Sequence, residues 1–558
     1  METNDPRLTF GRFLADVASR HSERTAIVFE GRRVRYAELE GEARTLARGL
    51  IGAGVVKGAR VAVLMANRPE WIVSAFAVGM IGGVLVPVNT FATRDELDYI
   101  LRHSDASMLL MQPSLLKHRF VDELVEGHPE IAEGVPGRIR CAALPQLRRV
   151  ACLDLETPRG AVEPWSDLLA QAGDVSDALL DGVIDEVEPS DDGILIYTSG
   201  TTANPKGVLH SQRAGILQSW RFADILLLDS NDRIYTTYPF FWTAGLAMSI
   251  GPAFASGAML LLQETFEPEA ALALIESEHA TAVHAWPHQQ KAMAEHPTAG
   301  RRDLTSVRKL DSTSPIAKLA GVEKDEYGTG ASYGLSETFT IASMLPADAP
   351  AAIRRETSGK PLPGTAIRIV DPETGAPLPI GQEGEIAVKG VTFMRGYHKV
   401  LPENYLDDAG YFRTQDGGSF DTEGYLHWSG RLSNLIKTGG ANVSPVEIEA
   451  TLANFPGLRV AIPVGIGHPT LGEVVILCAV CEAGATVEEA EVRTFLRSKL
   501  AAYKVPKRVL FFRPEELSFT GNQKIQVDPL REAAQKRLEA EGAEIDGYRY
   551  QGSEAKSS

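Results

Sequence analysis

The segment Ile194-Leu-Ile-Tyr-Thr-Ser-Gly-Thr-Thr-Ala-Asn-Pro-Lys-Gly207 is the most informative stretch of the chain. An apolar run, typical of a buried strand, leads into six small or hydroxylated residues and then into Lys206. Small residues let backbone N–H groups surround a phosphate, and hydroxyl and ammonium groups add donors and charge. The order differs from G-x-x-x-x-G-K-[ST], which disfavours a P-loop kinase or ATPase. A surface turn has the same composition, so the segment alone leaves both interpretations open.

Length and charge narrow the class of protein. A chain of 558 residues exceeds what one hydrophobic core supports, so we expect several domains. Its 56 basic and 73 acidic side chains give a formal net charge of −17, and we expect no nucleic-acid partner because the basic footprint is missing. Four cysteines exclude a disulfide scaffold. Cys478 and Cys481 lie in the predicted strand Val474–Cys481, where alternation sends them to opposite faces instead of to one metal.

The N-terminus and one uncharged stretch bear on where in the cell the protein is located. The first ten residues, METNDPRLTF, lack the charged and apolar regions of a signal peptide. Trp71–Thr93 carries no charge, but three glycines and Pro87 interrupt it, which is typical of a helix, a turn and a buried strand. We therefore expect a cytoplasmic protein without an integral membrane segment.

Helical and strand patterns alternate from Val34 onward. The pattern predicts a helix with Leu39, Ala43, Leu46 and Leu50 on one face, strands at Arg60–Leu64 and Val84–Val88, and a helix beginning at Pro69. Repeated βαβ units of this kind predict an α/β fold with parallel sheets covered by helices. The acidic stretch Asp154–Asp192 is interpreted as a loop-rich connector.

The pattern changes twice towards the C-terminus. Thr365–Val370 and Gly384–Lys389 alternate apolar and polar residues between turns, which predicts small antiparallel strands and a β-barrel-like part. After Gly430 the chain is typical of a compact α+β unit. We predict an N-terminal domain over residues 1–430, a small mobile C-terminal domain over 431–551 and a disordered tail over 552–558.

Several further segments, in a fixed order, resemble motifs of one family. The segment around Lys206 resembles the phosphate loop of the adenylate-forming superfamily, which comprises acyl-CoA synthetases, peptide-synthetase adenylation domains and luciferases. The other matching segments are Tyr333-Gly-Leu-Ser-Glu-Thr338, Tyr411-Phe-Arg-Thr-Gln-Asp416, Gly430-Arg431, Ile436-Lys-Thr-Gly-Gly440, Val443-Ser-Pro-Val-Glu-Ile-Glu449 and Thr520-Gly-Asn-Gln-Lys524. Together they span most of the chain, so the resemblance is far more specific than any single motif.

The resemblance implies a reaction in two halves. A carboxylate attacks the α-phosphate of ATP, giving acyl-AMP and pyrophosphate, and the thiol of coenzyme A then displaces AMP. The first half brings an anion against a polyanion, so the site must supply cations and oriented donors. ATP, Mg²⁺ and coenzyme A are therefore the expected cofactors and co-substrates, with a small carboxylic acid as the other substrate.

The resemblance also assigns roles to residues. By analogy with the family, the expected nucleotide and metal groups are Thr198, Ser199, Gly200, Thr201, Thr202 and Lys206 on the β- and γ-phosphates, Tyr333 and Gly334 at adenine, Ser336 at the α-phosphate, Glu337 on Mg²⁺, Asp416 and Arg431 on the ribose, and Lys524 between α-phosphate and carboxylate. Lys206, Glu337 and Lys524 are the expected catalytic groups. Alone, each of these residues would be an ordinary core or surface residue.

Coenzyme A is expected to bind in the C-terminal part. The resemblance places pantetheine along the Gly439-Gly440 turn, which has no side chains to block it. Tyr503, Lys504 and Lys507 are candidates for the CoA nucleotide, although a basic surface loop explains them equally well. Ser433 stands at the family's hinge position, about which the C-terminal domain is expected to pivot between the half-reactions.

The acid pocket is expected around Pro239-Phe-Phe-Trp-Thr-Ala-Gly245. Amino-acid-activating relatives place an Asp where this chain has Trp242, so an ammonium group would remain unpaired. We therefore expect an apolar fatty, aryl-alkanoic, alicyclic or steroid acid and not an α-amino acid. Expected pocket residues are Trp242, Gly245, Trp286, Ser312 and Leu335, with Phe240 and Phe241 either in the wall or in the core.

The chain departs from the family pattern at several positions. Ala203 and Gln415 stand where Gly is usual, as does Gln523 just before Lys524, and Ser312-Thr-Ser-Pro315 replaces a Gly-Gly-Ala turn. A β-carbon at a glycine position restricts φ. No departure removes a charged catalytic side chain, so they bear on substrate and rate more than on reaction class.

Three alternatives stay open at this stage. One is a sibling enzyme, which would be either an amino-acid-adenylating domain or an acyl-AMP ligase that loads a carrier protein. Too few residues follow Lys524 for a carrier domain. Another is a luciferase-like oxidative enzyme. The third is a non-catalytic nucleotide-binding regulator, which would not need all the charged residues that the chain retains. A homodimer is compatible with each of these.

Overall fold

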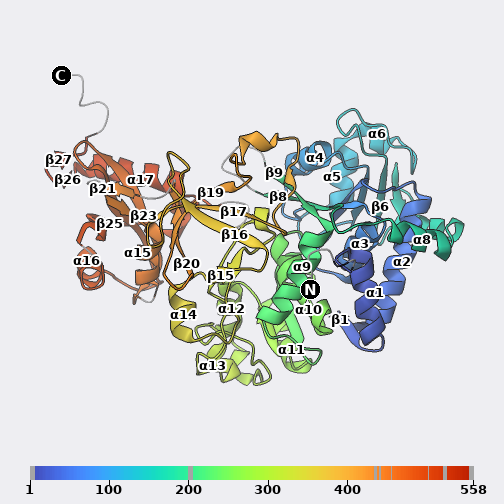
Figure 1. Cartoon of the computed structure of the whole chain (residues 1–558), viewed down its shortest axis with the longest axis horizontal. Coiled ribbons are helices and arrows are strands. Elements are labelled where there is room, and N and C mark those ends of the chain that lie inside the picture. The colour runs from blue at the N-terminus through green and yellow to red at the C-terminus, as the bar shows by residue number, and fades with distance from the viewer. Residues whose placement is uncertain are drawn as a thin grey trace. The chain divides into compact units, whose positions relative to one another are not determined.

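The computed structural model describes residues 5, 7–198, 205–432, 436–438, 441–453, 455–500, 502–519 and 525–551. Within them the chain divides into two compact units. The first comprises Met1–Ile367 with Val388–Phe412, and the second comprises Arg368–Ala387 with Arg413–Ser558. The fold is mixed α/β with a large N-terminal and a small C-terminal part, as the sequence predicts (Figure 1).

An eight-stranded sheet carries the phosphate segment. Its order is β18-β9-β8-β4-β3-β5-β6-β7. The strands are β3 (Arg60–Leu64), β4 (Val84–Pro87), β5 (Met108–Met111), β6 (Arg149–Cys152), β7 (Val162–Pro164), β8 (Asp192–Thr198), β9 (Lys206–Ser211) and β18 (Gly396–Tyr397). From β8 to β7 all neighbours are parallel, whereas β9 runs antiparallel to β8 and β18.

A five-stranded sheet forms the other large layer of the first unit. Its order is β12-β10-β11-β1-β2, built from β12 (Ala282–His284), β10 (Arg233–Thr236), β11 (Met259–Leu262), β1 (Thr25–Phe29) and β2 (Arg32–Arg35). Only the β1–β2 hairpin is antiparallel among the described pairs of this sheet. Its two-residue turn, Glu30-Gly31, has positive φ at both positions, which matches the twist of the strands.

Helices cover the two sheets (Figure 1) and bury apolar side chains in three cores. The main core includes side chains from α1 (Phe10–His21), α2 (Tyr36–Gly52), α3 (Pro69–Met80), α7 (Trp165–Ala170), α8 (Asp177–Asp185), α9 (Gln212–Ile225) and α10 (Gly251–Ser256). A second core uses α4 (Arg94–His103), α5 (Phe120–Gly127) and α6 (Pro129–Ala132), and a third uses α11 (Pro268–Ser277), α12 (Pro287–Ala294) and α13 (Ala317–Ala320). A short helix, α14 (Ala351–Glu356), follows.

The periodic patterns predicted these elements well, and one interpretation is wrong. Leu39, Ala43, Leu46 and Leu50 are all buried on α2, and the first predicted strand coincides with β3. The stretch Asp154–Asp192 is not a loop-rich connector, because it contains β7, α7 and α8. The buried Leu168 and Leu180 hold these helices against the main core, and the acidic composition conceals that face.

Two small sheets follow the large ones. One consists of β13 (Ser332–Tyr333), β14 (Ser343–Met344) and β15 (Lys360–Pro361). The other has the order β16-β17-β19-β20, with β16 (Thr365–Val370), β17 (Gly384–Gly390), β19 (Phe412–Phe420) and β20 (Leu426–Arg431). The strands that the sequence predicts here are present. They form an open sheet, and in the described part of the chain no barrel closes, which corrects the β-barrel-like prediction.

The rest of the second unit is a sheet with helices on it. The strands are β21 (Ile436–Thr438), β22 (Ala441–Val443), β23 (Leu458–His468), β24 (Gly472–Cys481) and β25 (Arg508–Phe511), and the helices are α15 (Pro445–Leu452), α16 (Glu489–Arg497) and α17 (Val527–Glu541), followed by the hairpin β26 (Glu544–Ile545) and β27 (Tyr548–Arg549). Cys478 and Cys481 belong to different cores of this sheet, as alternation predicts.

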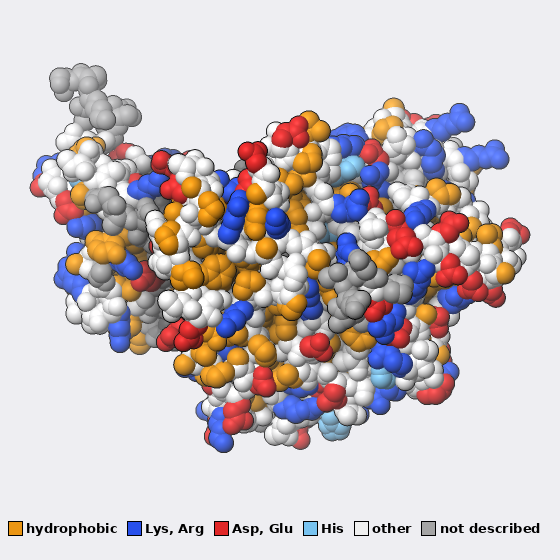
Figure 2. Space-filling model, viewed as in Figure 1, with side chains coloured by type: hydrophobic (Ala, Val, Ile, Leu, Met, Phe, Trp, Pro, Cys, Tyr) orange, Lys and Arg blue, Asp and Glu red, His pale blue; other side chains and the backbone are white. Residues whose placement is uncertain are grey.

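The surface and helix lengths bear on partners. Figure 2 shows acidic and basic side chains interspersed over the visible face. Of the helices in the described ranges, none combines the length and the apolarity that a membrane crossing requires. Localisation in the cytoplasm and a homodimer stay predictions.

Candidate active site

The phosphate segment joins two paired strands. Thr198 ends β8 and Lys206 begins β9, and the two residues lie opposite each other in the ladder. Ser199, Gly200, Thr201 and Thr202 lie outside the described residues. Strand alternation places Lys206 and His210 on the same face of β9, and the Lys206 side chain is exposed. The cation is therefore fixed at the start of a strand whose other end is buried.

Three hydrogen bonds hold the segment Ser336-Glu337. His210 Nε2 donates to the Ser336 carbonyl over 2.7 Å, and the Met394 N–H donates to the Glu337 carbonyl over 2.8 Å. The Tyr397 hydroxyl donates to Glu337 Oε1 over 2.6 Å, a short hydrogen bond to a carboxylate. Backbone and side chain of Glu337 are thus both fixed, which is what a ligand or charge partner requires.

Tyr397 also lies beside the phosphate lysine. Lys206 Nζ is 5.1 Å from the centroid of the Tyr397 ring, within the range of a cation–π contact. Tyr397 pairs with Val208 in the β18–β9 ladder, which sets this arrangement. Within the described ranges Lys206 makes no ion pair with a carboxylate, so its charge stays available for an anion. One ring therefore connects the site's cation to its carboxylate.

The turn after Glu337 is strained and firmly held. Phe339 and Thr340 have φ of 52° and 85°, in the left-handed region that non-glycine residues disfavour. The buried Gln218 amide donates to the carbonyls of Thr338, Phe339 and Ile341 over 3.3, 3.2 and 2.8 Å. A β-carbon on Gly334 would lie 2.0 Å from the Thr340 carbonyl oxygen, so only glycine fits there. Helix α9 thus fixes the shape of this turn.

His210 is a structural histidine. It is fully buried, and burial lowers its pKa to about 4, so it is neutral near pH 7. Because a carbonyl oxygen only accepts, the proton must reside on Nε2. The ring also meets Phe339 edge-on, with centroids 4.9 Å apart. His210 therefore orients Ser336 and takes no proton from a substrate at neutral pH.

The second unit carries the expected ribose pair. Asp416 and Arg431 lie opposite each other on β19 and β20, and Arg431 Nε is 3.0 Å from Asp416 Oδ1. Arg431 Nη1 also donates to the Thr414 carbonyl over 2.7 Å. Gln415, which lies between Thr414 and Asp416 in the chain, has φ of 61°, which explains why glycine is usual at this position. Its N–H donates to Glu385 Oε1 over 2.8 Å, which helps to hold the strained backbone.

Gln415→Gly is expected to stabilise the protein by about 0.5 to 1 kcal/mol. Relief of the left-handed strain contributes about 1 to 2 kcal/mol, and the greater freedom of glycine in the unfolded chain offsets part of it. The melting temperature should rise by up to about 1 °C in thermal unfolding. Gln382→Gly, at an exposed turn position where φ is not positive, is the matched control and should lower stability. A lower melting temperature for Gln415→Gly would contradict the strain.

The expected acid-binding segment is anchored at both ends. The side chain of Asn67 donates to the Tyr238 carbonyl over 2.9 Å and accepts from the Phe240 N–H over 3.0 Å. A β-carbon on Gly245 would lie 2.3 Å from the Pro239 carbonyl oxygen, so glycine is required for the turn to close. Gly245 also begins a π-helical turn, Gly245–Ile250, a feature common at functional sites.

The predicted pocket residues differ in their exposure to solvent. Trp242 and Trp286 are partly exposed and their rings meet edge-on, with centroids 6.2 Å apart. Phe240 packs on Trp71 in the main core, and Phe241 is buried beside Trp242. Ser312 lies in a turn in which the Asp311 carboxylate accepts from the Thr313 N–H. The Ser314 hydroxyl then donates to Gln290, on the helix that follows Trp286. Leu335 is partly exposed and lies between Gly334 and Ser336.

Some expected residues are engaged elsewhere or lie outside the described ranges. Lys507 forms an ion pair with Asp546 (2.8 Å), and Lys504 forms one with Glu447 (2.6 Å). Tyr503 is 49% exposed, beside Lys504. The hinge residue Ser433, the turn Gly439-Gly440 and the catalytic candidate Lys524 are not among the described residues. The CoA contacts therefore stay predictions.

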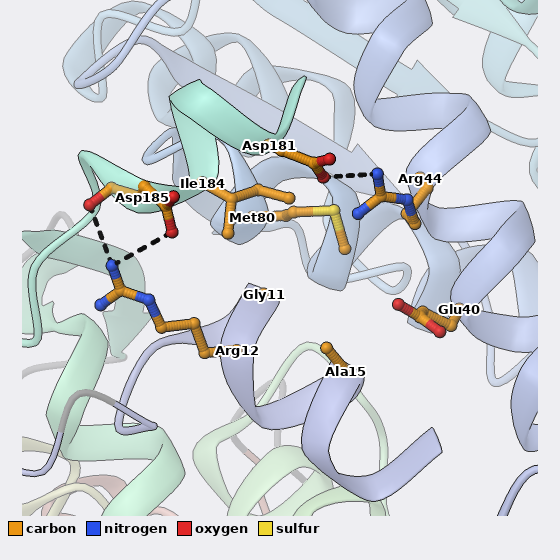
Figure 3. Close-up of a pocket in the computed structure, with 9 residues that line it drawn as sticks. All are labelled: Gly11, Arg12, Ala15, Glu40, Arg44, Met80, Asp181, Ile184 and Asp185. Carbon is orange, nitrogen blue, oxygen red and sulfur yellow. Dashed lines mark hydrogen bonds and ion pairs between the residues drawn. The ribbon is translucent and has the colours of Figure 1, made fainter. Parts of the chain in front are cut away.

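A small hollow elsewhere is a different feature (Figure 3). It has a volume of about 300 Å³ and is lined by α1, α2, α8 and the end of α3, with Arg12, Arg44, Asp181 and Asp185 among its residues. Arg44 pairs with Asp181 (2.7 Å), and Arg12 donates to the Asp185 carbonyl (2.9 Å). Since these charges satisfy one another and no site residue lines it, the hollow has no assigned role.

Sequence reasoning missed Tyr397, His210 and Gln218. Their partners lie 60 or more positions away in the chain, so no local spacing reveals the contacts. A polar residue within an otherwise apolar strand or helix face is the only signal. His210 and Gln218 both carry it, since each is buried among apolar neighbours.

Tyr397→Phe is expected to raise the Mg²⁺ concentration for half-maximal adenylation and to lower the adenylation rate by about tenfold. The ring would keep its packing, while the Glu337 carboxylate would lose the hydrogen bond that orients it, worth about 1.5 kcal/mol for a charged acceptor. Pyrophosphate release across a Mg²⁺ titration measures both. Tyr405→Phe, with a ring 5.0 Å from that of Tyr397, is the control. An unchanged Mg²⁺ profile would contradict the positioning role.

Comparison with known proteins identifies the family. The AMP-binding enzyme family matches residues 14–398, and the C-terminal domain of AMP-binding enzymes matches residues 447–524. A feruloyl-CoA synthase of Amycolatopsis is 33% identical over 90% of this chain and 94% of its own length. An indoleacetate–CoA ligase of Aromatoleum aromaticum is 32% identical over 91% of this chain and 95% of its own.

A solved structure shares the fold. ATP-bound MatB of Rhodopseudomonas palustris superposes with a TM-score of 0.76, at 26% identity, over 94% of this chain and 98% of its own. Fold, motifs and relatives together define an adenylate-forming enzyme of the acid–CoA ligase class. The chain belongs to the AMP-binding enzyme family. The resemblance to acyl-CoA synthetases is thereby confirmed.

Proposed function

We propose that this enzyme joins an apolar ring-bearing or fatty carboxylic acid to coenzyme A in two steps. A carboxylate oxygen attacks the α-phosphorus of ATP, the bond to the bridging β-phosphate oxygen breaks, and pyrophosphate leaves. The sulfur of coenzyme A then attacks the acyl carbon, the bond to AMP oxygen breaks, and the thiol proton passes to solvent. Acyl-CoA and AMP are the products.

The observation that carries the proposal is the arrangement around Tyr397. The ring lies beside the Lys206 ammonium, and its hydroxyl holds the Glu337 carboxylate 2.6 Å away. A preorganised cation next to a preorganised anion is suited to a metal-bound polyphosphate, because the cation meets phosphate oxygens and the carboxylate meets the metal. A regulator that only binds nucleotide would not need a fixed carboxylate there.

The donor set fits Mg²⁺. Mg²⁺ takes one or two protein carboxylates and completes its octahedron with water and phosphate oxygens. Glu337 offers one oriented carboxylate, and no cluster of three or more His, Cys, Asp or Glu suited to a metal occurs in the described ranges. Glu337 would hold the ion, which would neutralise part of the phosphate charge. A closed structural metal site, by contrast, would need several such ligands.

The remaining nucleotide roles follow the family assignment. Ser336 carries a hydroxyl for the α-phosphate, and the backbone that positions it is fixed by His210. Tyr333 precedes the Gly334 turn and is assigned to adenine. Asp416 can accept and Arg431 can donate hydrogen bonds to ribose hydroxyls. Lys524 is assigned to the reacting carboxylate and α-phosphate, where its charge would oppose the repulsion of two anions.

The acid is proposed to be apolar. Trp242 and Trp286 present aromatic surface, and no carboxylate is available from Trp242 for a substrate ammonium. Relatives named for feruloyl and indoleacetyl substrates support a ring-bearing acid. A buried ammonium group without a partner costs a binding free energy on the order of several kcal/mol. Free α-amino acids should therefore be poor substrates.

Product analysis tests the proposal. The purified protein is mixed with ATP, Mg²⁺ and a panel of fatty, aryl-alkanoic, alicyclic and steroid acids, with and without coenzyme A. We expect acid-dependent pyrophosphate release and CoA-dependent AMP and acyl-CoA. Acyl-AMP that accumulates and is insensitive to coenzyme A would favour a carrier-protein or oxidative relative. No pyrophosphate with any acid would refute the proposed function.

A further inference from the structure

A series of aromatic rings connects the surface to Tyr238. Phe91, which is 53% exposed, meets Phe241 (5.9 Å between centroids), and Phe241 meets Trp242 (5.2 Å). Trp242 meets Trp286 (6.2 Å), and Trp286 meets Tyr238 (4.6 Å). Rings at 4.5 to 7 Å favour edge-on or offset contacts, and a planar or cyclic ligand extends such a series better than a flexible alkyl chain does.

The polar atoms of this series lack hydrogen-bond partners. Within the described ranges, the Tyr238 hydroxyl and the indole N–H groups of Trp242 and Trp286 make no hydrogen bond, although each side chain is only partly exposed. Other partly or fully buried tyrosines of the unit differ. The hydroxyl of Tyr235 donates to Gln263 (2.5 Å), and that of Tyr327 donates to the Leu226 carbonyl (3.3 Å).

Two tryptophans at the main core provide a contrast. The indole N–H groups of Trp71 and Trp220 also lack partners, but both N–H groups are sealed from solvent, Trp71 within the main core and Trp220 packed against it. Those of Trp242 and Trp286 are not sealed in this way. Three donors without partners therefore lie along one aromatic series and are reachable from solvent, which is the usual composition of a site that is apolar overall and fixes a ligand by a few polar groups.

The protonation states of the side chains in this series indicate which kind of ligand oxygen they can bind. Burial raises the pKa of Tyr238 to about 12, so its hydroxyl stays protonated and can donate at neutral pH. His284, stacked on Tyr238 with centroids 6.0 Å apart, is neutral because burial lowers its pKa to about 4. Phenol, indoles and neutral imidazole carry no formal charge, so an uncharged acceptor such as a carbonyl, ether or hydroxyl oxygen is the match.

We propose that the acid carries a ring with an uncharged oxygen remote from its carboxylate, and that Tyr238, Trp242 and Trp286 bind that oxygen and ring. The inference rests on the proposed function and names the substrate class of the same site. Apolar rings supply most of the contact, and the donors supply discrimination. An acid without the oxygen leaves donors without partners in the complex, which lowers its specificity constant.

Matched acids test the inference in the full-length enzyme. The pairs are 3-(4-hydroxyphenyl)propanoate with 3-phenylpropanoate, and 3-(4-oxocyclohexyl)propanoate with 3-cyclohexylpropanoate, with octanoate as the straight-chain reference. We expect wild-type kcat/KM to favour the oxygenated member of at least one pair by about tenfold or more. Tyr238→Phe should reduce that preference by about three- to tenfold, while the KM for ATP stays unchanged.

Indole variants and controls complete the experiment. Trp242→Phe and Trp286→Phe keep a ring but remove an N–H, and at least one should reduce the same preference. Tyr327→Phe and Trp220→Phe make the same chemical changes outside the series and should leave it intact. The preference ratio is the decisive measurement, since a folding defect lowers both members of a pair together.

The possible failures are distinguishable. Efficient formation of octanoyl-CoA with poor turnover of both ring pairs would overturn the inference and leave the proposed function standing. Equal losses for both members of each pair in Tyr238→Phe would also overturn it. If no acid of the panel gives pyrophosphate, the proposed function fails and the inference fails with it.

Discussion

Glu337→Gln is expected to slow adenylation by about a hundredfold to a thousandfold. The substitution keeps the shape of the side chain, and an amide oxygen can still accept from the Tyr397 hydroxyl, which is 2.6 Å from the native carboxylate. What is lost is the negative charge with which Glu337 would hold Mg²⁺ beside the phosphates. Loss of one preorganised electrostatic group at a reacting centre typically costs this much.

Single-turnover pyrophosphate release measures the effect. The melting temperature should stay close to that of the wild type, because the backbone bonds from His210 and Met394 do not involve the carboxylate. Glu326→Gln, at a side chain 78% exposed, is the matched control and should adenylate normally. A Glu337→Gln enzyme with wild-type rates would remove Glu337 from the site, whatever its geometry.

Lys524→Ala is expected to abolish adenylation while sparing much of thioester formation from pre-formed acyl-AMP. The family assignment gives this lysine a role only while carboxylate and α-phosphate approach, when its charge opposes their repulsion. In the second half-reaction the nucleophile is a thiol and AMP is leaving, so that role ends. Loss of this single cation should lower the rate of adenylation by about a hundredfold or more.

Separate assays of the two halves decide the matter. Acyl-AMP is synthesised chemically and mixed with enzyme and coenzyme A, and acyl-CoA formation is compared with pyrophosphate release from ATP and acid. Lys536→Ala, on α17, is a control with the same chemical change. Equal losses in both halves, with native folding shown by circular dichroism, would contradict the split role.

Local pattern and ordered motifs carry most of what the sequence could predict. Apolar spacing located α2 and β3 because a buried face imposes its own period on the residues. The order of the motifs is sufficient to indicate the family. The acidic composition of α7 and α8 wrongly predicts a loop-rich connector, since their few buried leucines lie among charged residues. Openness of the four-stranded sheet depends on how strands pair, which alternation alone does not specify.

The site shows a sharper limit. Glu337 could be named from its motif, but the hydroxyl that orients it comes from Tyr397, and the imidazole behind it comes from His210. Such pairs are consequences of tertiary packing, and their residue types are ordinary in their own segments. The strained Gln415 is intermediate: the sequence marks it as a departure, and only the backbone shows that φ is positive there.

The alternation of β9 determines which insertions and deletions this enzyme can tolerate. Lys206 and His210 share one face because His210 is four positions after Lys206, which is an even offset. One residue added or removed between them would turn either the ammonium away from Tyr397 or the imidazole away from Ser336. Changes in length before Lys206 leave that parity untouched. Natural variation in the phosphate segment is therefore expected to accumulate upstream of the strand and to be absent within it.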